Sequence, residues 1–178
     1  IPGVPNTCSL TPADSVWRSK VSTLPVHPSS TTWINSAGAG GALKADFGSG
    51  LWNGGKIGIP YNVVSGTQPK TTIQSWWYPS QSDQVGYPIP ANPPIEGGPD
   101  ADPDSDRHVL MIDRDSMMLY ELWQVLPCEK GKEKGWKAGS GAIWNLRSNE
   151  PRKEGWTSAD AAGLAIFPGL VRYEEVER

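Results

Sequence analysis

Most side chains capable of chemistry in this sequence lie within residues 97–125. An acid-rich loop with alternating aspartates comes first, and His108 and Glu121 follow in two apolar runs of strand length. The runs, 108–112 and 117–125, are separated by turn-forming residues, which predicts a β-hairpin. A rigid hairpin would hold these polar groups in fixed positions.

The register of this hairpin decides which side chains meet. A turn centred on residues 115–116 places His108 opposite Trp123 and Leu110 opposite Glu121, so that all four share one face. A slip of one residue would send His108 and Glu121 to opposite faces. The expected register therefore brings a histidine, a carboxylate and an aromatic ring together.

Two carboxylates beside an aromatic platform are the groups that glycoside hydrolysis requires. We expect Asp106 and Glu121 to converge at one end of the sheet beside Trp123, as the acid and the base or nucleophile. His108 would orient or tune one of them. The alternative is an ion cluster at the sheet edge, formed with the neighbouring arginines.

The acid-rich loop also suggests a metal site. Asp100, Asp102 and Asp104 supply hard oxygen ligands at close spacing, which suits calcium. Pro99 and Pro103 interrupt the pattern, and it does not match an EF-hand loop. The alternative is a solvated acidic loop that binds no ion.

Aromatic residues are the third chemical feature, since the chain has 9 tryptophans, more than a core of this size usually needs. Sugar rings present apolar faces that stack on exposed aromatic rings. We expect Trp76, Trp77, Tyr78 and Trp156 to be ligand-binding residues, with Trp123 beside the carboxylates. The alternative is that most tryptophans belong to the core.

Composition narrows the class of protein. At 178 residues, with 16 basic and 19 acidic side chains and no basic stripe, the chain fits one domain without affinity for nucleic acid. No apolar run reaches the ~18 residues of a membrane span. The start at Ile1 indicates a processed or trimmed chain, and the abundance of Gly, Pro and Trp is typical of a loop-rich, secreted protein.

The two cysteines, Cys8 and Cys128, belong to no CxxC pair that would suggest zinc or redox chemistry. We expect a disulfide between them that fixes the Pro-rich N-terminus to the domain. The alternative is two unrelated buried thiols.

The pattern of elements predicts a mainly β fold, an antiparallel β-sandwich or β-barrel with two or three short helices and long Pro/Gly-rich loops. Residues 1–28 form an extended N-terminal strap, and 29–178 form a single β-rich domain. Short helices are expected from Ser29 or Ser30 to Gly38 and over 157–164. The charged segment at the end leaves open that the chain is the N-terminal part of a longer protein.

Several blocks of the sequence, among them GIPYNVV, SDRHVLMID, LYELW and GSGAIWNLRSN, together with GWTSADAAGLAIFPGLVRY, resemble an uncharacterised family of secreted microbial proteins. The resemblance implies no activity. The polar and aromatic character of these blocks suggests a site made from the following residues: Asp106, His108, Glu121, Asn149, Arg152 and Asp160.

The sequence thus predicts a secreted, glycan-directed protein, with a polysaccharide or cell-surface glycan as partner, and favours a polysaccharide hydrolase. Calcium is the one cofactor that it suggests. The alternatives are a non-catalytic carbohydrate-binding or cell-surface module and a structural extracellular protein.

Overall fold

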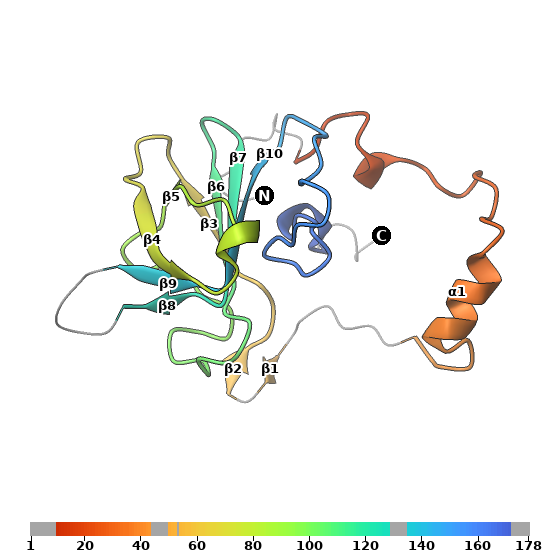
Figure 1. The fold of residues 1–178 in the computed structure, drawn as a ribbon, viewed down its shortest axis with the longest axis horizontal. Coiled ribbons are helices and arrows are strands. Elements are labelled where there is room, and N and C mark those ends of the chain that lie inside the picture. The colour runs from red at the N-terminus through yellow and green to blue at the C-terminus, as the bar shows by residue number, and fades with distance from the viewer. Residues whose placement is uncertain (1–9, 44–49, 53, 129–134, 172–178) are drawn as a thin grey trace.

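The computed structural model describes residues 10–43, 50–52, 54–128 and 135–171. This part of the chain contains one α-helix, ten strands and three short 3₁₀-helices (Figure 1). In chain order they are η1 (Val16–Arg18), α1 (Ser30–Ala37), β1 (Leu51–Trp52), β2 (Gly55–Lys56), β3 (Tyr61–Val64), β4 (Thr71–Trp76), η2 (Pro79–Gln81), β5 (Gly86–Tyr87), β6 (Val109–Asp113), β7 (Met118–Trp123), β8 (Leu126–Pro127), β9 (Trp136–Ala138), β10 (Ser140–Asn145) and η3 (Phe167–Gly169).

The strands form two four-stranded sheets and a small β1–β2 ribbon. The order of the first sheet is β10-β7-β6-β3, and that of the second is β5-β4-β9-β8. The fold is therefore mainly β, as predicted. Each large sheet nevertheless contains one parallel pair, β3 with β6 and β4 with β9, so both sheets are mixed rather than fully antiparallel.

The parallel pairs arise from the way in which the chain alternates between sheets. Between β3 and β6 it passes through β4 and β5 of the other sheet. This excursion returns the chain to the start of β3 and supplies the long crossover that a parallel pair requires, without a helix. The sequence showed no alternation of strands and long helices, and so gave no sign of parallel pairing.

The hairpin of β6 and β7 has the expected register. Leu110 pairs with Glu121 and Asp113 pairs with Met118. The four residues between the paired strand ends, 114–117, form the turn. Met117 has a left-handed φ of 58° in this turn. The alternation along both strands therefore places His108, Leu110 and Glu121 on one face of the sheet, as predicted.

Both faces of this hairpin are buried, which explains why residues 109–112 are continuously apolar. Val109 and Met111 join a core that includes residues of the second sheet. Leu110 and Ile112 join a second cluster, which contains Phe167 of η3. The first sheet is thus covered by the second sheet on one face and by the C-terminal segment on the other (Figure 1).

Helix α1 of the N-terminal segment lies apart from this body, whereas Leu10 packs against the second cluster and Asp14 accepts a hydrogen bond from Asn149. Helix α1 begins at Ser30 and ends before Gly38, whose φ of 98° is left-handed, so the first predicted helix is confirmed. The helix has no buried residue, and Figure 1 shows it at a distance from the sheets. Among the described residues, none of the helices has the length and apolar character needed to cross a membrane.

The second predicted helix, over residues 157–164, is absent. The Ser158 hydroxyl accepts a hydrogen bond from the backbone N–H of Asp160 (2.9 Å), and Gly163 has a φ of 71°. Serine side chains that bond to nearby backbone groups compete with helix formation. The segment consequently forms an irregular loop, and η3 follows it.

Close packing of the two sheets can be tested at Gly141 in β10. A Cβ atom there would lie 2.5 Å from the Tyr87 Oη and 2.8 Å from Leu122 Cδ2, so we expect Gly141→Ala to lower the free energy of unfolding by about 1–3 kcal/mol. A Cβ at Gly40 would meet no atom within 4 Å, which makes Gly40→Ala the matched control. Urea denaturation measures both, and equal stability of the two variants would contradict the close approach.

Candidate functional site

A cavity of about 780 Å³ lies between the N-terminal segment, the end of the β6–β7 hairpin and the C-terminal loop. Aromatic side chains from three separate segments contribute to its wall: Trp17, Tyr78 and Trp123. Polar side chains contribute as well, chiefly Asp106, His108, Thr157 and Asp160. The cavity therefore combines flat apolar surfaces with hydrogen-bonding groups.

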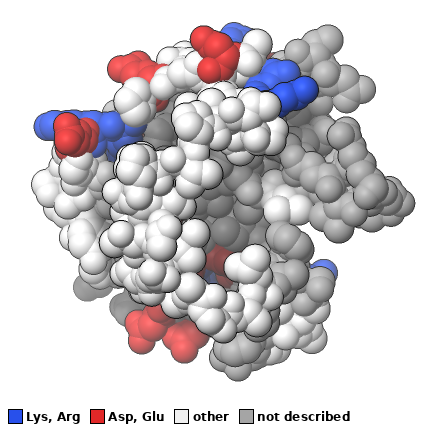
Figure 2. All heavy atoms as spheres, turned by 90° about the vertical axis from the view of Figure 1, so that its right-hand side faces the viewer, with Lys and Arg blue, Asp and Glu red and all other residues white. Residues whose placement is uncertain are grey.

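The face of the molecule on the side of the N-terminal segment is hollowed near its centre (Figure 2). Acidic atoms are visible in the depth of this hollow, whereas most other charged groups in the view lie towards its upper and lower margins. Among the described residues in this view, uncharged ones form most of the surface around the hollow.

His108 lies in the wall of the cavity and is only 8% exposed. Its Nδ1 is 2.5 Å from a carboxylate oxygen of Glu96, and its Nε2 is 3.1 Å from the carbonyl oxygen of Ala159. Both ring nitrogens therefore face acceptors, which a doubly protonated imidazolium satisfies by donating from each. Burial opposes the charged ring, but the hydrogen bond and charge of Glu96 outweigh it and raise the pKa of His108.

Asp106 stands beside this histidine and is exposed. Its Oδ1 accepts a hydrogen bond from the indole Nε1 of Trp123 (2.9 Å), and the Trp123 ring lies 6.1 Å from that of Tyr78. The residue between Asp106 and His108, Arg107, has a left-handed φ of 44°. Three backbone carbonyls accept hydrogen bonds from its guanidinium, which offsets the cost of about 1–3 kcal/mol for this backbone conformation.

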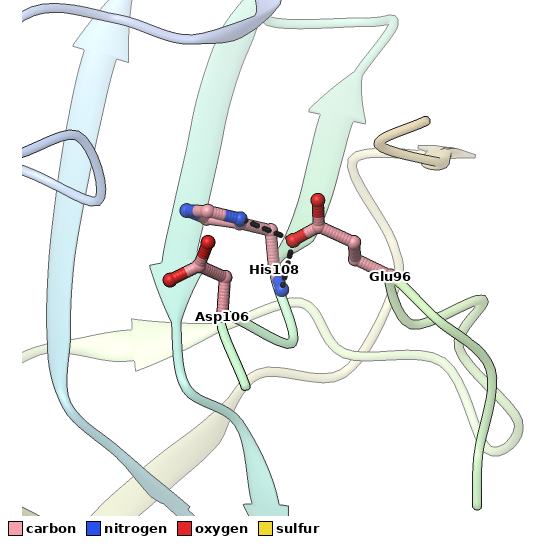
Figure 3. Close-up of side chains that lie close together, drawn as sticks. All are labelled: Glu96, Asp106 and His108. Carbon is pink, nitrogen blue, oxygen red and sulfur yellow. Dashed lines mark hydrogen bonds and ion pairs between the residues drawn. The ribbon is translucent and has the colours of Figure 1, made fainter. Parts of the chain in front are cut away.

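Glu96 is a member of the site that the sequence did not reveal. It lies in the Pro/Gly-rich loop before the acidic segment, and the backbone N–H of His108 also points to its carboxylate (3.3 Å). Figure 3 shows the imidazole edge facing Glu96, with the Asp106 carboxylate beside the ring. One ligand atom from each of Glu96, Asp106 and His108 lies within 4.8 Å of the others.

Glu121 does not occupy the place expected from the sequence. It shares the face of His108, but its side chain is 0% exposed and is not part of the cavity wall. Its carboxylate accepts hydrogen bonds from the backbone N–H groups of Ile166 (3.0 Å) and Phe167 (2.8 Å) and from the indole of Trp144 (3.1 Å). The expected pairing with Asp106 in one cleft is therefore wrong, because the C-terminal segment covers Glu121.

Arg152, which was also expected to contact a substrate, lies outside the cavity wall. Its guanidinium donates to Asp83 (2.7 Å) and to the backbone carbonyls of Gln81 and Thr157. It also lies over the rings of two tryptophans, and only 7% of the side chain is exposed. Arg152 thus connects η2 to the loop that forms part of the cavity wall.

The other predicted contact residues divide between the cavity and the rest of the molecule. Tyr78, Trp123 and Asp160 line the cavity. The remaining four lie outside its wall: Trp76 packs against the first core, Trp77 is 49% exposed, Trp156 stacks on Arg152, and Asn149 donates to Asp14. Trp17, from the N-terminal segment, was not predicted.

The predicted calcium ligands do not come together. Asp100, Asp102 and Asp104 are exposed, and the Asp102 carboxylate accepts a hydrogen bond from the backbone N–H of Asp104 (2.9 Å). Among the described residues, the group whose ligand atoms converge contains none of these three.

The predicted disulfide is not tested, because Cys8 lies outside the described residues. The thiol of Cys128 donates a hydrogen bond to the side-chain oxygen of Gln74 (2.7 Å).

No family model matches this chain, and comparisons with curated proteins and with solved structures also gave no match.

The buried carboxylate predicts a specific dependence of stability on pH. Burial raises the pKa of Glu121 from its ordinary value of 4.5 to about 7, although the N–H donors of Phe167, Ile166 and Trp144 favour the anion. The folded chain then binds a proton at Glu121 more tightly than the unfolded chain does. Protonation of Glu121 therefore contributes fully to the free energy of unfolding below pH 4.5, and this contribution is lost as the pH rises to 7. We expect Glu121→Gln to remove this trend and to cost about 1–3 kcal/mol, because an amide nitrogen cannot accept from the N–H groups.

Urea denaturation of both proteins from below pH 4.5 to above pH 7 measures this difference, and all groups common to both proteins cancel. Glu150→Gln, at an exposed position, is the control for loss of one negative charge. Parallel stability curves for the wild type and Glu121→Gln would contradict the raised pKa.

Proposed function

We propose that this protein is a secreted, glycan-directed protein that binds a sugar in the cavity beside the β6–β7 hairpin. The observation that carries the proposal is the joint lining of one cavity by three aromatic rings and two carboxylates: Trp17, Tyr78, Trp123, Asp106 and Asp160. Secretion is supported by the Gly-, Pro- and Trp-rich composition. The resemblance to a secreted microbial family stands as part of the same proposal.

The aromatic rings suit the apolar face of a sugar. Tyr78 is 48% exposed and lies against Trp123 at the cavity, so part of its ring is available to a ligand. Aromatic contacts contribute about 0.5–1.5 kcal/mol beyond the area that they bury. Pockets for small molecules typically combine such surfaces with a few polar groups.

The polar groups suit sugar hydroxyls. Asp106 and Asp160 offer carboxylate oxygens as acceptors, and the Thr157 hydroxyl lies in the same wall. Hydrogen bonds to charged groups contribute about 1.5–3 kcal/mol, more than those between neutral groups. A ligand with many hydroxyls and one apolar face fits both the aromatic and the polar groups of this wall.

The two sheets pack on a common core, which supports a sandwich-like architecture with two parallel strand pairs as the scaffold. The loops at one end of the hairpin then carry the site. Binding sites commonly lie on loops that a rigid scaffold positions.

Adjacent aromatic residues provide a matched test of glycan binding. Tyr78 and Trp77 are 48% and 49% exposed, but only Tyr78 lines the cavity. We expect Tyr78→Ala to weaken binding by about tenfold, equivalent to about 1.4 kcal/mol, and Trp77→Ala to leave it unchanged. A glycan array followed by titration calorimetry measures the affinities, and an equal effect of both variants, or no binding to any glycan, would refute the proposal.

Polysaccharide hydrolysis is a second candidate function, favoured by the two carboxylates that line one cavity. Asp106 and Asp160 take the place of the pair expected from the sequence, since Glu121 is covered. Glycosidases use one carboxylic acid to protonate the leaving oxygen and a second carboxylate as base or nucleophile. Asp106 is exposed and Asp160 is half-buried, so the two carboxylates differ in their contact with solvent.

Release of reducing sugar from polysaccharides is the assay for this activity. We expect Asp106→Asn and Asp160→Asn each to lower turnover by about 10²–10⁴-fold. The amide oxygen still accepts a hydrogen bond, so glycan binding should be weakened but not abolished. Glu154→Gln, at an exposed position away from the cavity wall, controls for the charge. Binding without release in the wild type would exclude the hydrolase and leave the glycan-binding function.

A further inference from the structure

We propose that Glu96, Asp106 and His108 form a binding site for a single Zn²⁺ ion at the edge of the cavity. The proposal concerns the ion alone and holds whatever ligand the cavity takes. One ligand atom from each residue lies within 4.8 Å of the others (Figure 3). All three residues lie in the long connection between β5 and β6, residues 88–108, which folds back so that Glu96 meets His108 at the start of β6.

The donor set selects the type of ion. One imidazole nitrogen with two carboxylate oxygens is a ligand set that zinc accepts, at about 2.0–2.2 Å from each atom. Calcium instead takes six to eight oxygen ligands in most sites. Two carboxylates also neutralise the charge of a divalent cation, which lowers the cost of holding it beside a buried histidine.

Groups around the three residues fix the orientation of each ligand. The Nε2 of His108 faces the carbonyl oxygen of Ala159 at 3.1 Å, which keeps a proton on Nε2 and leaves Nδ1 as the atom for the metal. The indole of Trp123 donates to Oδ1 of Asp106, so Oδ2 of Asp106 is the oxygen that would bind the ion. Histidine ligands commonly donate their second N–H to a backbone carbonyl in this way.

The ion would replace the proton between the ring and Glu96. Nδ1 and the Glu96 oxygen are 2.5 Å apart, whereas two ligand atoms of tetrahedral zinc are about 3.4 Å apart. The pair must therefore open by about 1 Å. Glu96 lies on a loop and its side chain is 24% exposed, which gives it room to move. His108 immediately precedes β6 and is held by the carbonyl of Ala159.

The cavity gives the ion an open side. Asp106 and His108 both line the cavity, so three protein ligands would hold the ion and a fourth position would face the cavity. Zinc sites that act on substrates keep such a position for water or substrate. Arg107, the nearest cation in sequence, directs its guanidinium to the carbonyls of Pro99, Ala101 and Val125 and not to the three ligands.

The test is titration of the full chain, previously dialysed against a chelator, with Zn²⁺ under calorimetry. We expect one ion per chain, and at least tenfold weaker binding in Glu96→Gln and in Asp106→Asn. Both amides keep an oxygen acceptor for the present hydrogen bonds, so the fold should survive, and circular dichroism verifies it. Asp102→Asn, in the neighbouring acidic loop, is the matched control and should bind as the wild type does.

The two histidines of the chain provide a direct readout of the ligand atom. In a ¹⁵N spectrum of the imidazole nitrogens, Zn²⁺ should shift Nδ1 of His108 and leave His27, an exposed residue of the N-terminal segment, unchanged. Titration with Co²⁺ adds a spectroscopic test, since oxygen and nitrogen ligands give d–d bands without a sulfur-to-cobalt charge-transfer band.

Four results would overturn the proposal. They are no binding of Zn²⁺, a shift of His27 alone, a charge-transfer band that places the ion on a cysteine thiol, and loss of binding in Asp102→Asn with Asp106→Asn unaffected. The last result would place the ion in the acidic loop.

Discussion

The hydrogen bonds between the buried carboxylate of Glu121 and the backbone of Ile166 and Phe167 are the interaction on which the site depends. Glu121 lies in the centre of the first sheet with no exposed surface. Burial of an unpaired carboxylate would be prohibitive, so the donors on the C-terminal segment must stay in place. In return, that segment is fixed over the sheet and forms one wall of the cavity.

The same loop is fixed at three further points by polar groups. His108 faces the carbonyl of Ala159, the Ser140 hydroxyl donates to the carbonyl of Ser158 (2.6 Å), and Arg152 donates to the carbonyl of Thr157. Because this wall has no regular secondary structure between 157 and 165, its backbone groups need partners from elsewhere. The partners come from His108 at the start of β6, Ser140 of β10 and Arg152 of the following loop, in addition to Glu121 of β7.

The sequence predicted the local structure of the hairpin well and the identity of the site less well. The turn at residues 115–116 and the two-residue period placed Leu110 opposite Glu121, because both signals are local. They could not show that η3 would cover Glu121, since that contact spans 46 positions in the chain. Glu96 was missed for the same reason: an isolated glutamate between proline and glycine residues carries no sign of its partner twelve positions later.

Long-range topology also explains the difference between the predicted and observed sheets. Short strands and turn residues indicate a β fold, but parallel pairing of β3 with β6 is decided by the packing of the intervening strands. The helix expected over 157–164 failed because Ser158 bonds to its neighbours and to the carbonyl of Leu164. Polar side chains near a helix start can cap a helix or form a turn, and tertiary contacts decide between the two.

Asp106 is the point at which the proposed functions compete. If the Asp106 carboxylate coordinates a cation, the cation neutralises its charge. The carboxylate then cannot take a proton from a sugar hydroxyl or from water. Without the ion, His108 pairs with Glu96, and Asp106 is left with one hydrogen bond from Trp123 and an exposed surface. Its carboxylate is then free to bind or to act on a sugar. In the proposed zinc site, occupancy of the three-residue group would decide whether the cavity presents a cation or a free carboxylate to a ligand, while the aromatic rings would be the same in both states.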